Sequence, residues 1–383
     1  MNRIEFSDQV EGRYDRHQLI AWWDQSVVSR AHLLVAGAGA LGNEVLKLLA
    51  LIGVGHIRVV DFDTISRSNL SRMVLFREGE IGRPKVEVVV ERLHEINSDV
   101  EVQGIQGDLR FDIGLGDYRA ANIVIGCLDS VNARWALNRK CLQAGVNWID
   151  GGISDHHGLV AHYSPSGGAC YECNFTPATL ERFNRRYSCP FGLTSDEVEA
   201  KVPTTAITTS VIAGIQVQQA LLWLHGVEND RLQPGERLLV YLKPFRMMKD
   251  RLPQNSDCLA HNSLPIEIPI LNGSNELTVK EVIASARLVY PEILALSLSY
   301  DLVTDFDCPA CGFSEEINRP KEKVFHQESH CPKCGQFRQP IMLSAITQDQ
   351  KESALSLKEI GIPPREILAF NTSGESVFLQ ITE

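Results

Sequence analysis

Three glycines at fixed spacing, Gly37, Gly39 and Gly42, are the residues of this sequence with the clearest chemistry. They follow an apolar run over 32–36, typical of a buried parallel strand, and precede a helical pattern over 41–51. A glycine-rich turn between a strand and a helix lets the backbone approach phosphate groups and presents helix N–H groups to them. The turn therefore predicts a phosphate-binding site.

An acidic residue, Asp61, stands 22 residues after Gly39, at the end of a second expected strand over 56–61. This is the usual place for the acceptor of the ribose hydroxyls in a dinucleotide-binding fold. With these residues alone, a nicotinamide-dependent oxidoreductase remains a valid interpretation.

Three charged residues downstream, Arg72, Lys85 and Asp129, favour a different chemistry. Lys85 stands at the start of an expected helix over 84–96, and Asp129 follows an expected strand over 122–125. Hydride transfer has no need for these charges around the phosphates. Attack of a carboxylate on an α-phosphate builds negative charge that Arg and Lys neutralise, while an Asp holds magnesium. The set predicts nucleotidyl transfer from ATP with Mg²⁺.

Four cysteines form two C-P-x-C knuckles separated by 19 residues: Cys308, Cys311, Cys331 and Cys334. Each pair closes a tight loop around a metal, and four thiolates complete a tetrahedral zinc site. The spacing predicts a structural zinc ribbon over 305–338.

Expected strands and helices alternate along the first part of the chain, which predicts an α/β fold: a Rossmann-like, mostly parallel sheet with helices on both faces. We expect an amphipathic helix over 13–30, long loops over 155–210, an apolar helix over 205–225 and a strand over 237–246. Residues 1–261 are expected to form this domain. Residues 262–383 are expected to form a smaller α+β accessory domain that carries the ribbon.

The 383 residues carry a net charge of −11, and 44% of them are hydrophobic. An acidic chain is a poor general binder of nucleic acid, because counterion release needs a basic surface. The sequence shows no apolar run of membrane-spanning length and no signal-peptide core near its first residues. We therefore expect a cytoplasmic protein, without nucleic-acid or membrane partners, whose cysteines are reduced.

The stretch 13–250 resembles the ThiF/MoeB/HesA family, which includes the ubiquitin-activating enzymes. The matching segments are 13–18, 37–42, 61–63, 68–72, 82–85, 127–129, 170–173 and 202–205. The resemblance implies an adenylyltransferase that activates the C-terminal carboxylate of a small ubiquitin-like protein.

The resemblance also implies residue roles. Asp61 would bind the ribose, with Asp63 in the same nucleotide-binding segment, and Asp129 would coordinate magnesium. The triphosphate would be contacted by Asn69, Arg72 and Lys85. Arg16 would reach the γ-phosphate, in this family usually from a partner subunit, so a homodimer is expected.

A second zinc site is implied by the third C-x-x-C pair, Cys170 and Cys173. In the family, another C-x-x-C near the end of the domain completes this site. Here the corresponding place holds Cys258 and His261, so we expect a site with three cysteines and one histidine, which zinc accepts.

Cys189 is a candidate nucleophile in an expected loop beside Arg185 and Arg186, since nearby arginines lower the pKa of a thiol. Thioester-forming relatives keep a cysteine in this stretch, directly before the Pro-Thr-Thr segment, where this chain has 198–201 instead. An enzyme that stops at adenylation, without a thioester, therefore remains an alternative.

Four hypotheses follow. The leading one is activation of a ubiquitin-like protein, with transfer to Cys189 and handover to a conjugating enzyme. The second is adenylation-only activation of a sulfur-carrier protein for cofactor biosynthesis. The others are a nicotinamide-dependent oxidoreductase and a non-enzymatic zinc-ribbon adaptor. We expect the stretch 262–383 to dock the carrier or the conjugating enzyme, with a stabilising appendage as the alternative.

Overall fold

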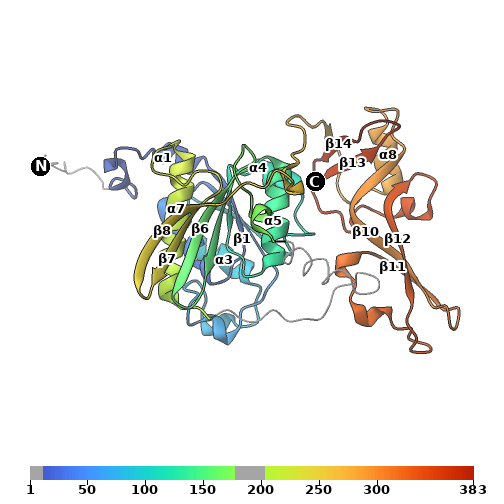
Figure 1. The fold of residues 1–383 in the computed structure, drawn as a ribbon, viewed down its shortest axis with the longest axis horizontal. Helices are drawn as coiled ribbons and strands as arrows, with labels where there is room; N and C mark the ends of the chain where they lie inside the picture. Colours follow the sequence, from blue (N-terminus) through green and yellow to red (C-terminus); the bar gives the residue numbers. More distant parts are fainter. Residues whose placement is uncertain (1–11, 177–202) are drawn as a thin grey trace, which may run out of the picture.

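The computed structural model describes residues 12–176 and 203–383. Its larger part is an eight-stranded sheet in the order β3-β2-β1-β4-β5-β6-β7-β8 (Figure 1). The first five strands in this order are parallel neighbours: β3 (Glu101–Gln106), β2 (His56–Asp61), β1 (His32–Ala36), β4 (Ile123–Gly126) and β5 (Trp148–Ile153). The expected mostly parallel sheet is confirmed.

Helices cover both faces of this sheet, as expected, because the buried strands are apolar on both sides. Leu33 and Val35 of β1 pack into one core, and Leu34 and Ala36 pack into the other. The first core lies under α2 (Ala40–Ile52), α3 (Lys85–Ile96) and α7 (Ala206–Leu224), and the second under α4 (Leu115–Ala120) and α5 (Val131–Ala144).

Three antiparallel strands extend the sheet: β6 (His157–Tyr163), β7 (Glu236–Leu242) and β8 (Phe245–Arg251). The expectation of loops over 155–210 is wrong for β6. The strand expected over 237–246 ends at Leu242, and the chain returns as β8 after a turn at Lys243 and Pro244. Residues 177–202 lie outside the described part of the chain.

The single helix expected over 13–30 is also wrong. The segment forms a 3₁₀ turn, His17–Leu19, and a short α1 (Gln25–Ser29) capped by Asp24, which accepts a hydrogen bond from the Ser26 backbone. Trp22 and Trp23 turn onto His225 at the end of α7. These tertiary contacts and the cap override the helical pattern.

The sequence was expected to contain no apolar run of membrane-spanning length, but within the described ranges helix α7 is long and apolar enough, by length and composition, to span a membrane. Half of the residues in its apolar stretch are buried inside the protein, where the helix packs on α2, β5 and β6. Its position in the core accounts for its composition.

The C-terminal part is a second, β-rich sheet in the order β11-β10-β13-β14-β9, with β12 also paired to β10. Helix α8 (Val279–Ala286) packs on its core. The strands are β9 (Ile270–Leu271), β10 (Ala295–Asp307), β11 (Ser314–Pro320), β12 (Gln339–Thr347), β13 (Ile367–Asn371) and β14 (Val377–Ile381).

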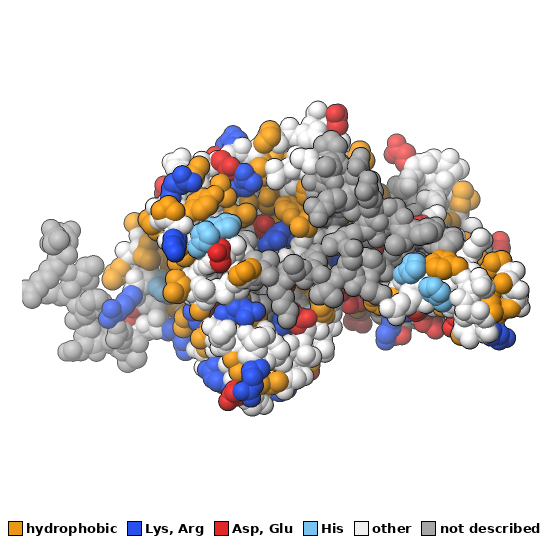
Figure 2. Space-filling model, turned by 60° about the horizontal axis from the view of Figure 1, so that its bottom comes forward, with side chains coloured by type: hydrophobic (Ala, Val, Ile, Leu, Met, Phe, Trp, Pro, Cys, Tyr) orange, Lys and Arg blue, Asp and Glu red, His pale blue; other side chains and the backbone are white. Residues whose placement is uncertain are grey.

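Short 3₁₀ turns complete the described structure: η2 (Arg67–Asn69), η3 (Glu78–Glu80), η4 (Tyr171–Asn174), η5 (Leu259–His261), η6 (Lys321–Lys323), η7 (His326–Ser329) and η8 (Lys351–Ala354). On the described part of the face in Figure 2, basic, acidic and apolar side chains are interspersed over the α/β part.

Candidate nucleotide and zinc sites

A cavity of about 1150 Å³ lies at the carboxyl ends of the parallel strands. In an open α/β sheet, this edge is where ligands bind. The cavity is lined by eight of the residues that the sequence predicted to bind nucleotide: Gly37, Gly39, Asp61, Asp63, Asn69, Arg72, Lys85 and Asp129. The fold thus brings together residues from the ends of β1, β2 and β4 and from the start of α3.

The glycine turn has the geometry that a phosphate site requires. Gly37 has a φ of +100°, and a Cβ added there would lie 2.6 Å from the Cys127 carbonyl oxygen. A Cβ on Gly42 would lie 2.0 Å from the Gly37 oxygen, so this glycine lets α2 pack closely on the turn. A Cβ on Gly39 would meet nothing within 4 Å, because Gly39 faces the open cavity at the N-terminus of α2. Phosphates are favoured at such a helix start.

Asp61 connects β2 to the glycine turn. One carboxylate oxygen accepts a hydrogen bond from Ala38 N at 2.7 Å, and the other accepts from Asp63 N at 2.8 Å. Burial raises the pKa of Asp61, and Lys85 together with these backbone donors opposes that rise. The carboxylate is therefore held in place at the edge of the cavity.

Lys85 is buried, and its Nζ lies 2.6 Å from Asp63 Oδ2 and 4.0 Å from Asp61 Oδ1. A buried lysine needs a partner charge, and here Asp63 supplies it. Arg72 donates to the Ser68 carbonyl at 2.7 Å. Both cations line the same cavity. The buried Asn69 lines it too, and its side chain caps η2 by accepting a hydrogen bond from Ser66 N.

Asp129 follows β4 and is exposed at the surface of the cavity. Its carboxylate oxygens are of the type that Mg²⁺ prefers. Asp129 is therefore the residue of this cavity wall that would hold a magnesium ion brought by a nucleotide.

Arg16 is placed away from the cavity of its own chain. It is exposed and precedes the 3₁₀ turn His17–Leu19. Neighbouring Tyr14 accepts a hydrogen bond from Asn97 at the end of α3, 2.7 Å away. Since α3 starts at the carboxyl edge of the sheet and runs back, its end and Arg16 lie toward the opposite edge.

Sequence reasoning missed a buried ion pair in the cavity wall. Arg134 Nε lies 3.1 Å from Asp150 Oδ1, and the guanidinium also donates to the carbonyls of Leu128 and Gly151. Burial raises the pKa of Asp150, and Arg134 opposes that rise. Arg134 lies in the first turn of α5 and its partner Asp150 lies 16 residues later on β5, so no local pattern joins the two. Five other residues line the cavity that the sequence did not predict: Tyr163, Tyr171, Arg237, Tyr241 and Glu322.

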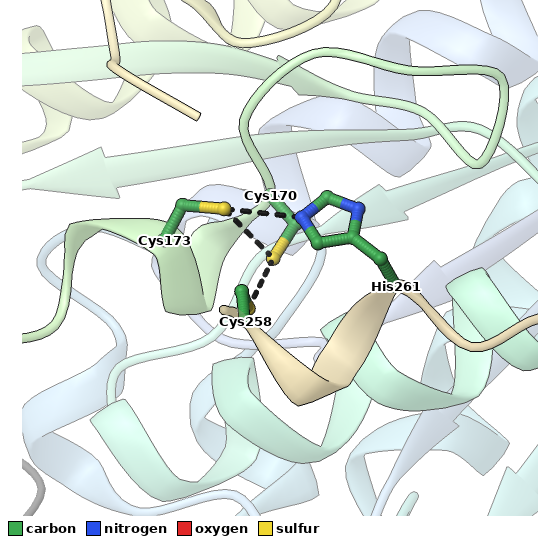
Figure 3. Close-up of side chains that lie close together, drawn as sticks. All are labelled: Cys170, Cys173, Cys258 and His261. Carbon is green, nitrogen blue, oxygen red and sulfur yellow. Dashed lines mark hydrogen bonds between the residues drawn. The ribbon is translucent and has the colours of Figure 1, made fainter. Parts of the chain in front are cut away.

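Four side chains that could hold a metal ion meet at η4 and η5 beside α5, where the family resemblance led us to expect them: Cys170, Cys173, Cys258 and His261 (Figure 3). Cys170 Sγ lies 3.7 Å from both Cys173 Sγ and Cys258 Sγ. Cys173 Sγ lies 3.1 Å from His261 Nε2. Ligands about 2.3 Å from a tetrahedral zinc ion lie about 3.7 Å apart, so this set fits zinc.

The ribbon cysteines form a second cluster. Cys308 Sγ lies 3.5 Å from Cys334 Sγ, and Cys311 Sγ lies 3.6 Å from Cys331 Sγ. All four sulfur atoms lie within 4.8 Å of one another, which fits a second tetrahedral zinc ion. Cys189 lies outside the described residues.

Comparison with known proteins identifies the family. The ThiF family model matches residues 14–260, and the chain belongs to this family. A molybdopterin-synthase adenylyltransferase of Salmonella typhimurium is 34% identical over 173 residues, 44% of this chain and 70% of that protein.

Two other relatives match this chain over only part of their own length. SUMO-activating enzyme subunit 2 of Dictyostelium discoideum is 34% identical over 38% of this chain and 22% of its own length. The adenylyltransferase and sulfurtransferase MOCS3 of Culex quinquefasciatus is 30% identical over 63% of this chain and 52% of its own length. The chain thus spans about half or less of these two relatives.

Among solved structures, the fold resembles that of Escherichia coli MccB with ATP. The TM-score is 0.55 at 22% identity, over 67% of this chain and 75% of that chain. At this identity the likeness concerns the fold.

Proposed function

We propose that this protein uses ATP to adenylate the C-terminal carboxylate of a ubiquitin-like or sulfur-carrier protein. One observation carries the proposal: Asp61, Lys85 and Asp129 line the same cavity as Gly39, which leaves open space at the N-terminus of α2. Relatives named as SUMO-activating and as molybdopterin-synthase adenylyltransferases support the same reaction class.

In the proposed reaction, the N-terminus of α2 and Gly39 receive the phosphates, and Asp61 accepts hydrogen bonds from the ribose. Lys85 exchanges its partner Asp63 for phosphate oxygens, and Arg72 neutralises charge on the same oxygens. Magnesium, held by Asp129, would neutralise further charge on the phosphates. A carboxylate oxygen of the carrier attacks the α-phosphorus, the bond to the β-phosphate bridging oxygen breaks, and pyrophosphate leaves.

The finer proposal is activation of a ubiquitin-like protein through a thioester. The Cys189 thiolate would attack the acyl carbon of the carrier adenylate, releasing AMP, and the carrier would then pass to a conjugating enzyme. Arg185 and Arg186 in the sequence support a reactive Cys189. Activation of a sulfur carrier without this thioester is the alternative, supported by the names of the MOCS3 relatives.

Arg16 supports a homodimer as the working unit, because it lies away from the cavity of its own chain. We further propose an adenylation domain over 1–261 with one structural zinc ion, and an accessory domain over 262–383 with another. Seven cysteines that must stay reduced to hold metal in these two clusters suit a cytoplasmic location.

The test is incubation of the full chain with ATP, magnesium and a panel of ubiquitin-fold proteins. Carrier-dependent exchange of pyrophosphate into ATP supports adenylation. A carrier adduct that reductant removes, and that is absent in Cys189→Ala, supports the thioester. Exchange without an adduct supports the sulfur-carrier alternative, and the absence of exchange with every carrier contradicts the proposal.

A further inference from the structure

The C-terminal part of the chain reaches the nucleotide cavity. Glu322, in η6 after β11, lines the cavity together with residues 107–110 of the loop between β3 and α4. Figure 1 shows the C-terminal part beside α4 and α5. The contact between these two segments, more than 200 residues apart in sequence, has no role in the function proposed above.

Lys323 makes one of the contacts between the two parts. Its Nζ lies 3.0 Å from Asp112 Oδ1, and Asp112 Oδ2 accepts a hydrogen bond from Asp108 N at 2.8 Å. Asp112 N in turn donates to the Asp108 carbonyl at 2.8 Å. One carboxylate therefore holds a backbone turn of the cavity wall on one side and a lysine of the C-terminal part on the other.

Two cations meet at the ring of Phe111. Lys323 Nζ lies 5.0 Å from the ring centroid, and Arg110 Cζ lies 5.1 Å from it. Arg110 is also paired with Asp108, with Nε 2.9 Å from Oδ1. Burial raises the pKa of Glu322, and the charge of Arg110 is among the influences that oppose the rise. The loop and η6 thus carry complementary charges.

A second contact fixes the far end of the loop. A Cβ added to Gly114 would lie 2.2 Å from the Pro364 oxygen, and one added to Gly116 would lie 2.5 Å from the Arg365 oxygen. Gly116 N donates to that Arg365 oxygen at 2.9 Å. The two glycines allow backbone to meet backbone, so the C-terminal part is packed directly on the start of α4.

The loop lies at the nucleoside end of the cavity. Gly107 N donates to the Asp61 carbonyl at 3.3 Å, so the loop starts beside the proposed ribose acceptor. The phosphates belong at Gly39, after β1, whereas the loop follows β3 at the edge of the sheet. Leu109, which belongs to this loop, offers an apolar surface for a planar base in this part of the cavity.

We infer that the C-terminal part completes the nucleotide site: Lys323, through Asp112, holds the loop over 107–110 against the base of the bound nucleotide, and Glu322 closes the same wall. Lys323 is a positioning residue, since it acts through the loop. The inference rests on the proposed function for the identity of the ligand as ATP.

The test compares three variants of the full chain with wild type. Lys323→Met removes the cross-contact, and Lys323→Arg keeps its charge. Lys321→Met is the matched control, because Lys321 is in the same turn but pairs with Asp301 of the C-terminal part, 3.4 Å away. Affinity is measured for ATP and for inorganic tripolyphosphate, which has no base, and amide hydrogen exchange is followed over 107–114.

Lys323→Met is expected to weaken ATP binding by about two- to five-fold, the effect of losing an ion pair between two side chains that are each more than a third exposed. Its affinity for tripolyphosphate should not change, and exchange over 107–114 should become faster. Lys323→Arg and Lys321→Met should behave like wild type. Equal affinity of wild type and Lys323→Met for ATP, or equal weakening toward both ligands, would overturn the inference. Wild type that binds no ATP would instead contradict the proposed function, while the exchange data would still test whether Lys323 holds the loop.

Discussion

The carboxylate of Asp61 accepts a hydrogen bond from the backbone amide of Ala38, 2.7 Å away. The proposed ribose acceptor at the end of β2 and the phosphate turn after β1 are therefore one connected unit. A change at Asp61 disturbs both ends of the nucleotide, which distinguishes this residue from an isolated surface acid.

Asp61→Ala is expected to weaken ATP binding at least about ten-fold, because the ribose acceptor and the support of the turn are lost together. It should also lower the free energy of unfolding by about 1–2 kcal/mol, since two backbone donors lose their acceptor. Asp61→Asn keeps one acceptor oxygen and should lie between wild type and Asp61→Ala. Calorimetric titration with ATP and urea denaturation measure the two effects. Wild-type affinity in Asp61→Ala would contradict the assignment.

The chain is expected to bind two zinc ions, one in each of its two four-residue clusters. His261→Ala and Cys311→Ser should each reduce the zinc content by one equivalent, because each removes one of four ligands. His261→Cys serves as the matched control and should keep both ions, since a thiolate replaces the imidazole. Elemental analysis of purified variants decides this. Two zinc ions retained in His261→Ala would show that His261 is not a ligand.

Arg16 is expected to act on the cavity of a partner subunit. Arg16→Ala and Lys85→Met should each be inactive as homodimers. Mixing equal amounts and allowing subunits to exchange should restore about a quarter of wild-type activity, because half of the dimers then contain one intact site. Carrier-dependent pyrophosphate exchange measures the recovery. If Arg16 instead acts on the cavity of its own chain, both sites of a mixed dimer are damaged, one by the loss of Arg16 and the other by the loss of Lys85. Mixing would then restore no activity.

His162 makes stability dependent on pH. It is buried between the Leu232 carbonyl, 2.8 Å from Nδ1, and the Asn147 side chain, 3.0 Å from Nε2. Burial lowers its pKa from 6.5 to about 4. Well above pH 6.5 the imidazole is neutral in both the folded and the unfolded chain. As the pH falls toward 4, the unfolded chain takes up a proton that the folded chain resists, so stability is lost.

The loss attributable to His162 should reach about 3 kcal/mol near pH 4. Urea denaturation of wild type and His162→Gln, at pH 7 and at pH 4.5, measures it. The variant should start less stable at pH 7 but lose less on acidification. An equal loss in both proteins would show that other groups cause the acid sensitivity.

The nucleotide cavity was predictable because its residues follow local rules. Buried parallel strands are apolar on both faces, so β1, β2 and β4 stand out as short runs, and the residues that end them must meet at one edge of the sheet. Gly39, Asp61 and Asp129 could therefore be placed together from the sequence, and the structure does bring them to one cavity.

Other features depend on partners far away along the chain. Strand β6 contains His157, Gly158 and His162, and becomes a strand only by pairing with β5 and β7. The packing of the C-terminal part on the start of α4 joins Gly114 and Gly116 to backbone about 250 residues later. Neither glycine has a positive φ, so no turn pattern revealed the need for it.

The central claim, adenylation of a carrier carboxylate, is tested most directly by intact mass spectrometry of the carrier. Wild type with ATP, magnesium and the correct carrier should give a carrier species heavier by one AMP moiety, sensitive to hydroxylamine and absent when the carrier lacks its C-terminal residue. Lys85→Met, which lacks the cation beside Asp61 and Asp63, should give none. The account would be contradicted if wild type consumed ATP but formed neither a carrier adenylate nor pyrophosphate with any member of a full panel of ubiquitin-fold proteins.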